Sequence, residues 1–197
     1  MSANEPIYGL VLTGGHSKRM GHDKALLRVK GETQLARAVG LLESVVDRVF
    51  VSTRRDQQDE PERSAFSRIV DHYEDLGPVA GILSAMEEHP GASWLVLACD
   101  LPKIDERTIR ELIAGRSPEH PFTAYRSSHD GLPEPLCALY AAGAASIVKG
   151  FVDEGVICPR KILIGSDTRL LDQPNPRALD NINTPEDLTR AGMKAAS

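Results

Sequence analysis

An apolar run followed at once by a glycine-rich, cationic segment is the feature that most constrains the fold of this chain. Residues 7–12 have the character of a buried strand, and residues 13–24 (Thr-Gly-Gly-His-Ser-Lys-Arg-Met-Gly-His-Asp-Lys) follow directly. Glycines leave backbone N–H groups accessible, and Lys18, Arg19 and Lys24 add positive charge around them. A loop of this composition at the end of a strand predicts a phosphate-binding site.

The spacing of the glycines distinguishes this loop from two common phosphate loops. Five residues separate Gly15 from Gly21, and Lys24 is not followed by Ser or Thr, so the Walker pattern does not fit. The dinucleotide-binding pattern Gly-x-Gly-x-x-Gly fails as well, because the Gly14-Gly15 pair leads into a polar segment. The remaining alternative is an ordinary turn that uses glycine for positive φ. The two cations of the pattern, Arg19 and Lys24, favour a phosphate site over such a turn.

Composition is that of an ordinary globular protein. The 197 residues show no linker or repeat, which predicts one domain over residues 1–197. A net charge of -5 without a long basic stripe argues against a nucleic-acid partner. No apolar run approaches the ~20 residues that span a bilayer, so we expect no membrane contact and a soluble, cytoplasmic protein.

Cys99, Cys137 and Cys158 are widely spaced and the histidines are scattered singly, which argues against disulfides or structural zinc.

Hydrophobic periodicity predicts alternating strands and helices. Strands are expected at residues 7–12, 26–29, 49–51, 69–70, 94–99, 122–126, 136–140 and 179–182, and helices at 35–46, 78–86, 109–113 and 144–152, with a further helix from Thr184. Residues 54–63 are predicted to be a solvated loop or surface helix, and 156–166 fit either helix or loop. This order predicts an α/β fold of three layers, with a mostly parallel, doubly wound sheet and a small antiparallel addition in the C-terminal half.

Two aspartates follow predicted strands of this sheet. Ligands bind at the carboxyl ends of parallel strands, so Asp71 and Asp100 are expected beside the glycine-rich loop. Asp100 is the predicted Mg2+ ligand, with phosphate oxygens and water completing the coordination. The alternatives are that Asp100 caps the helix that begins near Pro102 and that Asp71 only forms a turn.

These groups suit chemistry at phosphorus. Loop cations and Mg2+ together neutralise a triphosphate and support nucleophilic attack on it. No general-base motif lies near the loop, and a phosphate nucleophile needs none because it is already ionised. The sequence therefore favours attack of phosphate on phosphate, with pyrophosphate as the leaving group.

Five segments together resemble the molybdenum cofactor guanylyltransferase family, within the Rossmann-like nucleotidyltransferases. They are residues 12–26 (LTGGHSKRMGHDKAL), 77–82 (GPVAGI), 98–102 (ACDLP), 135–140 (PLCALY) and 181–188 (NINTPEDL). The last segment points to the guanylyl branch, since related cytidylyltransferases tend to carry an aspartate there. Thr13 stands where the family usually has alanine, and a strand-end asparagine of some members is replaced here by Ser52 or Thr53.

The resemblance implies transfer of GMP from GTP to molybdopterin with Mg2+, and transient contact with other cofactor-biosynthesis proteins. It implies the following roles: Leu12, Thr13, Gly14, Gly15 and Lys24 hold the nucleotide, Arg19 its phosphates, Asp71 the nucleoside and Asp100 the Mg2+, while Asn181 and Asn183 face the pterin. Asn181 and Asn183 could instead close a loop by hydrogen bonds.

Two other functions remain open. A nucleotidyltransferase could use CTP with molybdopterin or an NTP with a sugar phosphate, although sugar-nucleotide enzymes usually run longer. A non-catalytic nucleotide-binding module has no need for Arg19, Lys24 and Asp100 together, which favours an enzyme.

Overall fold

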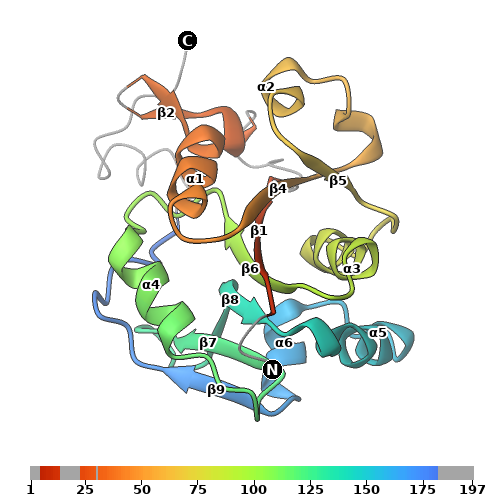
Figure 1. Ribbon diagram of the computed structural model, residues 1–197, viewed down its shortest axis with the longest axis vertical. Helices are drawn as coiled ribbons and strands as arrows, with labels where there is room; N and C mark the ends of the chain where they lie inside the picture. Colours follow the sequence, from red (N-terminus) through yellow and green to blue (C-terminus); the bar gives the residue numbers. More distant parts are fainter. Residues whose placement is uncertain (1–4, 14–22, 30, 182–197) are drawn as a thin grey trace.

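Strand β6 (Ser93–Ala98) is the middle strand of a seven-stranded sheet, and all six of its residues are buried. The computed structural model describes residues 5–13, 23–29 and 31–181. The sheet order is β5-β4-β1-β6-β8-β7-β9, and β2 and β3 form a separate two-stranded ribbon (Figure 1). The apolar character of residues 94–99 thus predicted the central strand correctly.

The remaining elements follow in chain order. They are β1 (Ile7–Leu12), η1 (Lys24–Leu26), β2 (Arg28–Val29), β3 (Glu32–Thr33), α1 (Gln34–Glu43), β4 (Arg48–Thr53), η2 (Arg55–Gln57), α2 (Pro61–Ser64), β5 (Arg68–Val70), α3 (Pro78–Glu88), α4 (Glu106–Ala114), β7 (Phe122–Arg126), β8 (Pro133–Tyr140), η3 (Ala142–Ala144), α5 (Ala145–Asp153), α6 (Pro159–Ile164) and β9 (Thr168–Leu171).

The sheet is parallel except at β8. Strands β5, β4, β1 and β6 pair in parallel, as do β7 and β9, whereas β8 runs antiparallel to both of its neighbours. The predicted mostly parallel sheet with an antiparallel addition is confirmed. Leu12 pairs with both Ser52 and Ala98, so β1, β4 and β6 end at one level. The chain segments that follow them therefore meet at one edge.

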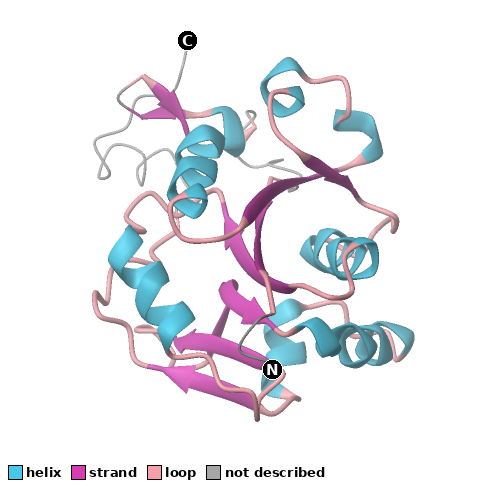
Figure 2. Cartoon of the chain, in the orientation of Figure 1, coloured by secondary structure: helices cyan, strands magenta, loops and turns pink. Residues whose placement is uncertain are grey.

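Helices cover both faces of the sheet, as Figure 2 shows. One core lies beneath α1 and α4, the other beneath α3, α5 and α6. Along β6, Leu95 and Leu97 join the first core, while Trp94 and Val96 join the second. Successive side chains of a strand point to opposite faces, so a strand between two helical layers is apolar throughout.

Local sequence sets the helix starts. The Thr33 hydroxyl accepts a hydrogen bond from the Ala36 amide at 3.0 Å and caps α1, as predicted. Helix α3 begins at Pro78 after Gly77, whose φ of 56° suits glycine. Helix α1 ends at Glu43, before the predicted end at residue 46, and the next two valines still pack against the core.

Two predicted strands differ in the structure. Of residues 26–29, only Arg28–Val29 form a strand, because residues 24–26 make a 3-10 turn capped by Asp23. Residues 179–181 form no strand: turn hydrogen bonds close residues 175–180, and within the described residues the last strand is β9, which lies on the sheet edge. Residues 156–166 contain α6. The predicted helix from Thr184 lies outside the described residues.

The prediction that residues 54–63 are solvated is wrong at Gln57 and at Arg63, which are both buried. Most of the segment is a surface excursion, but Arg63 on α2 is completely buried. Its charge alone suggested exposure, whereas carboxylate and hydroxyl partners from distant parts of the chain make burial tolerable. None of the helices in the described part of the chain has the length and apolar character that a membrane crossing requires.

Candidate active site at the carboxyl edge of the sheet

The parallel strands bring the predicted site residues to one edge. Thr13 follows β1, Asp71 follows β5, and Asp100 comes shortly after β6. Lys24 belongs to η1, the turn that returns after the glycine-rich loop. Gly14, Gly15, Arg19 and Asn183 lie outside the described residues, so their predicted roles stay predictions.

Lys24 and Asp100 form an ion pair across this edge. Lys24 Nζ lies 3.4 Å from Asp100 Oδ2, and both side chains are 21% exposed. The Asp23 carboxylate accepts a hydrogen bond from the Ala25 amide at 3.0 Å, which holds the turn that carries Lys24. A carboxylate and an ammonium that face each other at partial exposure remain accessible to a charged ligand.

The segment after Asp100 is anchored to α1. The Arg37 guanidinium donates to the carbonyls of Leu101 at 3.2 Å and Ile104 at 2.7 Å. Asp105, and not Asp100, caps α4, since its side chain accepts from the Thr108 amide. The capping alternative for Asp100 is therefore wrong, and its carboxylate points to a different partner.

Thr13 and Leu12 form the start of the loop. Leu12 is 7% exposed and packs in the core, so its side chain has a structural role here. The Thr13 hydroxyl donates to the Ser52 carbonyl at 2.7 Å and accepts from Arg63 Nε at 3.1 Å. A hydroxyl is required for both bonds, which explains why threonine stands at a position where the family resemblance suggests alanine.

Asp71 is a buried carboxylate with a hydroxyl partner. The Ser52 hydroxyl donates to Asp71 Oδ1 at 2.8 Å, and both residues are buried. Burial raises the pKa of Asp71 to about 6, while the Ser52 hydrogen bond and the nearby Arg54 charge oppose the rise. A Cβ added to Gly81 on α3 would lie 2.2 Å from Ser52 Oγ, so glycine is needed beside this pair.

Sequence reasoning missed Ser52 and Arg63. Ser52 was visible as a polar residue at a strand end, where either Ser52 or Thr53 replaces an asparagine that some members of the family carry. No sequence signal marked Arg63, because its partners lie 40 and 50 residues away.

A cavity of about 240 Å³ opens beside Asp100. It is lined by Pro78, Leu101, Glu134, Pro135, Leu136, Cys137, Cys158, Pro159, Arg160, Leu179 and Asn181. Arg160 enters an ion pair with Glu134 at 3.0 Å and another with Asp130 at 2.8 Å. Most residues that line the cavity are apolar, the Arg160–Glu134 pair adds charge, and the lining residue Leu101 directly follows Asp100.

Asn181 lines this cavity, and its predicted contact with a pterin stays a prediction. The preceding residue, Asp180, accepts from Lys103 Nζ at 2.8 Å and lies 3.3 Å from His129 Nε2. Lys103 belongs to the segment after Asp100, so Asn181 is tethered near the predicted metal ligand.

The side chains at this edge can be compared with the ligands that Mg2+ requires. Within residues 5–13, 23–29 and 31–181, no three His, Cys, Asp or Glu side chains cluster as a metal site. Mg2+ that is held partly by substrate phosphates and water needs only one or two carboxylates, and the partly exposed Asp100 side chain has the chemistry of such a ligand. The residues present therefore fit an ion that arrives with a nucleotide.

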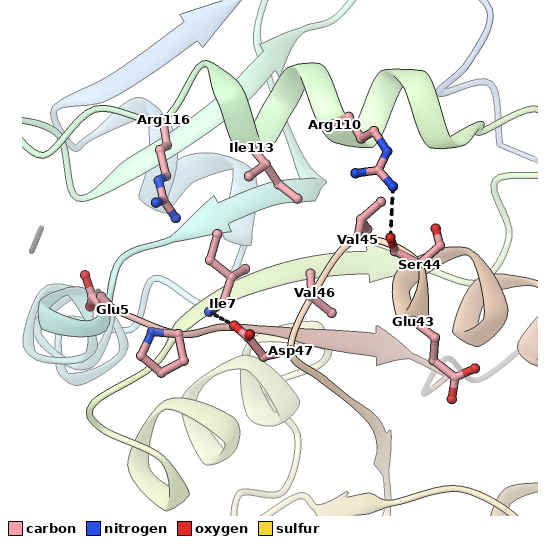
Figure 3. Close-up of a pocket in the computed structure, with 11 residues that line it drawn as sticks. Glu5, Ile7, Glu43, Ser44, Val45, Val46, Asp47, Arg110, Ile113 and Arg116 are labelled. Carbon is pink, nitrogen blue, oxygen red and sulfur yellow. Dashed lines mark hydrogen bonds between the residues drawn. The ribbon is translucent and has the colours of Figure 1, made fainter. Parts of the chain in front are cut away.

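A larger hollow, of about 580 Å³, lies at the opposite edge (Figure 3). It sits between the end of α1, the start of β1 and α4, where the Ile7 amide donates to Asp47 and Arg110 donates to the Ser44 carbonyl. Ligands of parallel sheets bind at carboxyl ends, and this hollow is at the amino end of β1. Size alone thus does not mark the site.

Comparisons with known proteins agree with this fold. The model of the MobA-like NTP transferase domain matches residues 9–163. A molybdenum cofactor guanylyltransferase of Pseudomonas paraeruginosa is 35% identical over 96% of this chain and 96% of its own length. A molybdenum cofactor biosynthesis bifunctional protein of Synechocystis is 38% identical over 92% of this chain, which spans about half (52%) of that relative's length.

Among solved structures, the molybdopterin-guanine dinucleotide biosynthesis protein A of Archaeoglobus fulgidus superposes with a TM-score of 0.75 at 25% identity. The match covers 93% of this chain and 96% of that one. The chain is therefore a member of the MobA-like NTP transferase family and belongs with the molybdenum cofactor guanylyltransferases.

Proposed function

We propose that this chain transfers GMP from GTP to the terminal phosphate of molybdopterin and releases pyrophosphate. The observation that carries the proposal is the Lys24–Asp100 pair, which lies at the carboxyl edge of the sheet beside the cavity that Asn181 lines. The names of the relatives support the same substrates.

In the proposed reaction, a phosphate oxygen of molybdopterin attacks the α-phosphorus of GTP. One P–O bond forms, the bond between the α-phosphorus and the bridging oxygen to the β-phosphate breaks, and its electron pair leaves with pyrophosphate. The attacking phosphate is already ionised, so no general base is required. Lys24 binds the negatively charged phosphates, and positioning with charge stabilisation supplies most of the catalysis.

Asp100 would hold Mg2+ together with phosphate oxygens and water. Bound there, the ion would neutralise phosphate charge and orient the triphosphate. Asp71, with its Ser52 partner, is proposed to bind on the nucleoside side, since a buried carboxylate can accept hydrogen bonds from a base or ribose.

The cavity beside Asp100 is proposed to take the pterin. It is about 240 Å³, lined by apolar side chains with Asn181 and the Arg160–Glu134 pair at its wall. Apolar walls with few polar groups suit a flat heterocycle that must be oriented.

The test is a matrix of substrates. Each of the four NTPs is combined with molybdopterin and with a panel of sugar phosphates, with Mg2+ or with EDTA, and pyrophosphate release is recorded. We expect release only with GTP, molybdopterin and Mg2+. Preference for CTP, or for a sugar phosphate, would replace this proposal with one of the two other transferase functions, and release in EDTA would remove the Mg2+ requirement.

A further inference from the structure

Arg63 is the most deeply buried cation among the described residues, and every nitrogen of its guanidinium has a partner. Its side chain is 0% exposed. Nε donates to the Thr13 hydroxyl at 3.1 Å, one terminal nitrogen donates to Asp23 Oδ2 at 2.6 Å and lies 3.5 Å from the Thr13 carbonyl, and the other pairs with Glu60. Burying a charge is costly unless it is fully paired, so these partners hold the Arg63 guanidinium in one position.

The two partners Thr13 and Asp23 stand at different places in the site. Thr13 ends β1 and also donates to the Ser52 carbonyl, which fixes it against β4. Asp23 uses both of its oxygens, one for Arg63 and one for the Ala25 amide. One planar guanidinium thus sets the distance between the end of β1 and the turn η1.

The contacts of Arg63 with Thr13 and Asp23 orient Lys24. It follows Asp23 directly, and its ammonium meets Asp100 at 3.4 Å. A rotation of η1 would move Lys24 relative to Asp100, and a displacement of about 1 Å at reacting groups can cost about 100-fold in rate.

We infer that Arg63 is a positioning residue for phosphate binding and transfer: through Asp23 it fixes Lys24 opposite Asp100. This inference rests on the proposed function. Arg63 is placed to act on Lys24 through Asp23, while its bond to Thr13 holds the guanidinium at the end of β1.

The test compares R63M, R63K, D23N and the double variant D23N/R63M with the wild-type protein. R110M is the matched control, because Arg110 also bonds a carboxylate, Glu106, and a backbone carbonyl, Ser44, at the opposite edge. For each protein, calorimetry gives the Kd of GTP and of guanosine, pyrophosphate release gives kcat and KM, and thermal unfolding gives Tm.

We expect R63M and D23N each to lower kcat about 100-fold and to weaken GTP binding, with the Kd of guanosine unchanged. R63K keeps the charge but lacks the planar fork, so its loss should be intermediate. Because Arg63 acts through Asp23, the double variant D23N/R63M should have a kcat less than about 3-fold below that of D23N. R110M should match the wild-type protein.

A lower Tm with wild-type kcat, KM and Kd in R63M would overturn the inference, and so would fully additive losses in the double variant. If R63M does not fold, D23N and R63K test the positioning role in its place. Wild-type kinetics in both variants would refute that role. Absence of turnover by the wild-type protein would instead contradict the proposed function, while the coupling between Arg63 and Asp23 would still be measured through GTP binding.

Discussion

Lys24 Nζ lies 3.4 Å from Asp100 Oδ2, although 76 residues separate the two in sequence. The pair joins the turn after the glycine-rich loop to the segment after the central strand. The proposed function assigns phosphate binding to the cation and Mg2+ binding to the carboxylate, which makes each residue a separate target for substitution.

Asp100→Asn should abolish catalysis and leave the fold intact. The amide keeps the size of the side chain but removes the charge that would bind Mg2+, and we expect a loss on the order of 1000-fold in pyrophosphate release. Asp105→Asn is the control, since asparagine caps a helix as well as aspartate does. Substantial Mg2+-dependent activity in Asp100→Asn would remove the metal role.

Lys24→Met should weaken triphosphate binding and spare nucleoside binding. Loss of one charged contact to phosphate predicts about a 10- to 100-fold higher Kd for GTP and an unchanged Kd for guanosine, measured by calorimetry. Lys149→Met removes a comparable surface charge on α5, paired with Asp153, and should change neither constant. Equal losses for GTP and guanosine would contradict the phosphate assignment.

Asp71→Asn should stabilise the fold in a pH-dependent way. The pKa of Asp71 is raised from 3.8 to about 6 by burial, so the folded protein binds a proton more tightly than the unfolded chain. The resulting stabilisation of the wild-type protein is fully present below pH 3.8 and is lost as the pH rises through about 6. Asparagine does not ionise, so the variant should gain up to about 3 kcal/mol at pH 7.5 but only about 0.5 kcal/mol near pH 4.

Thermal unfolding of the wild-type protein and the variant at the two pH values measures this gain. The same variant should bind GTP more weakly if Asp71 contacts the nucleoside. A Tm difference that is equal at both pH values would show that ionisation of Asp71 is not its cause.

Gly81→Ala should disturb the Ser52–Asp71 pair. The added methyl group would lie 2.2 Å from Ser52 Oγ and 3.1 Å from Asp71 Oδ1, so side chains must move. We expect a loss of about 1–3 kcal/mol in the free energy of unfolding, measured with urea, and weaker GTP binding. Gly40→Ala is the matched control in α1, where a methyl group meets nothing within 4 Å and should be neutral or slightly stabilising.

Local patterns were enough to predict most of the framework. Threonine before an apolar helical pattern marked the start of α1, a Gly-Pro pair marked α3, and the run at 94–99 marked the central strand. Predictions failed where local and tertiary demands differ. Leu179 is buried and apolar but lies on a turn. The last strand of the sheet within the described residues is Thr168–Leu171.

The sequence alone determined that a glycine-rich cationic loop, Asp71 and Asp100 follow strands of one parallel sheet, because strand ends can be read from hydrophobic periodicity. Only the tertiary structure decided how these groups are held: the hydroxyl of Ser52 on Asp71, the burial of Arg63 between Thr13 and Asp23, and the cavity that Asn181 lines. The reason is that periodicity reports which face of an element is buried, whereas a hydrogen-bond partner depends on which distant segments strand order brings together.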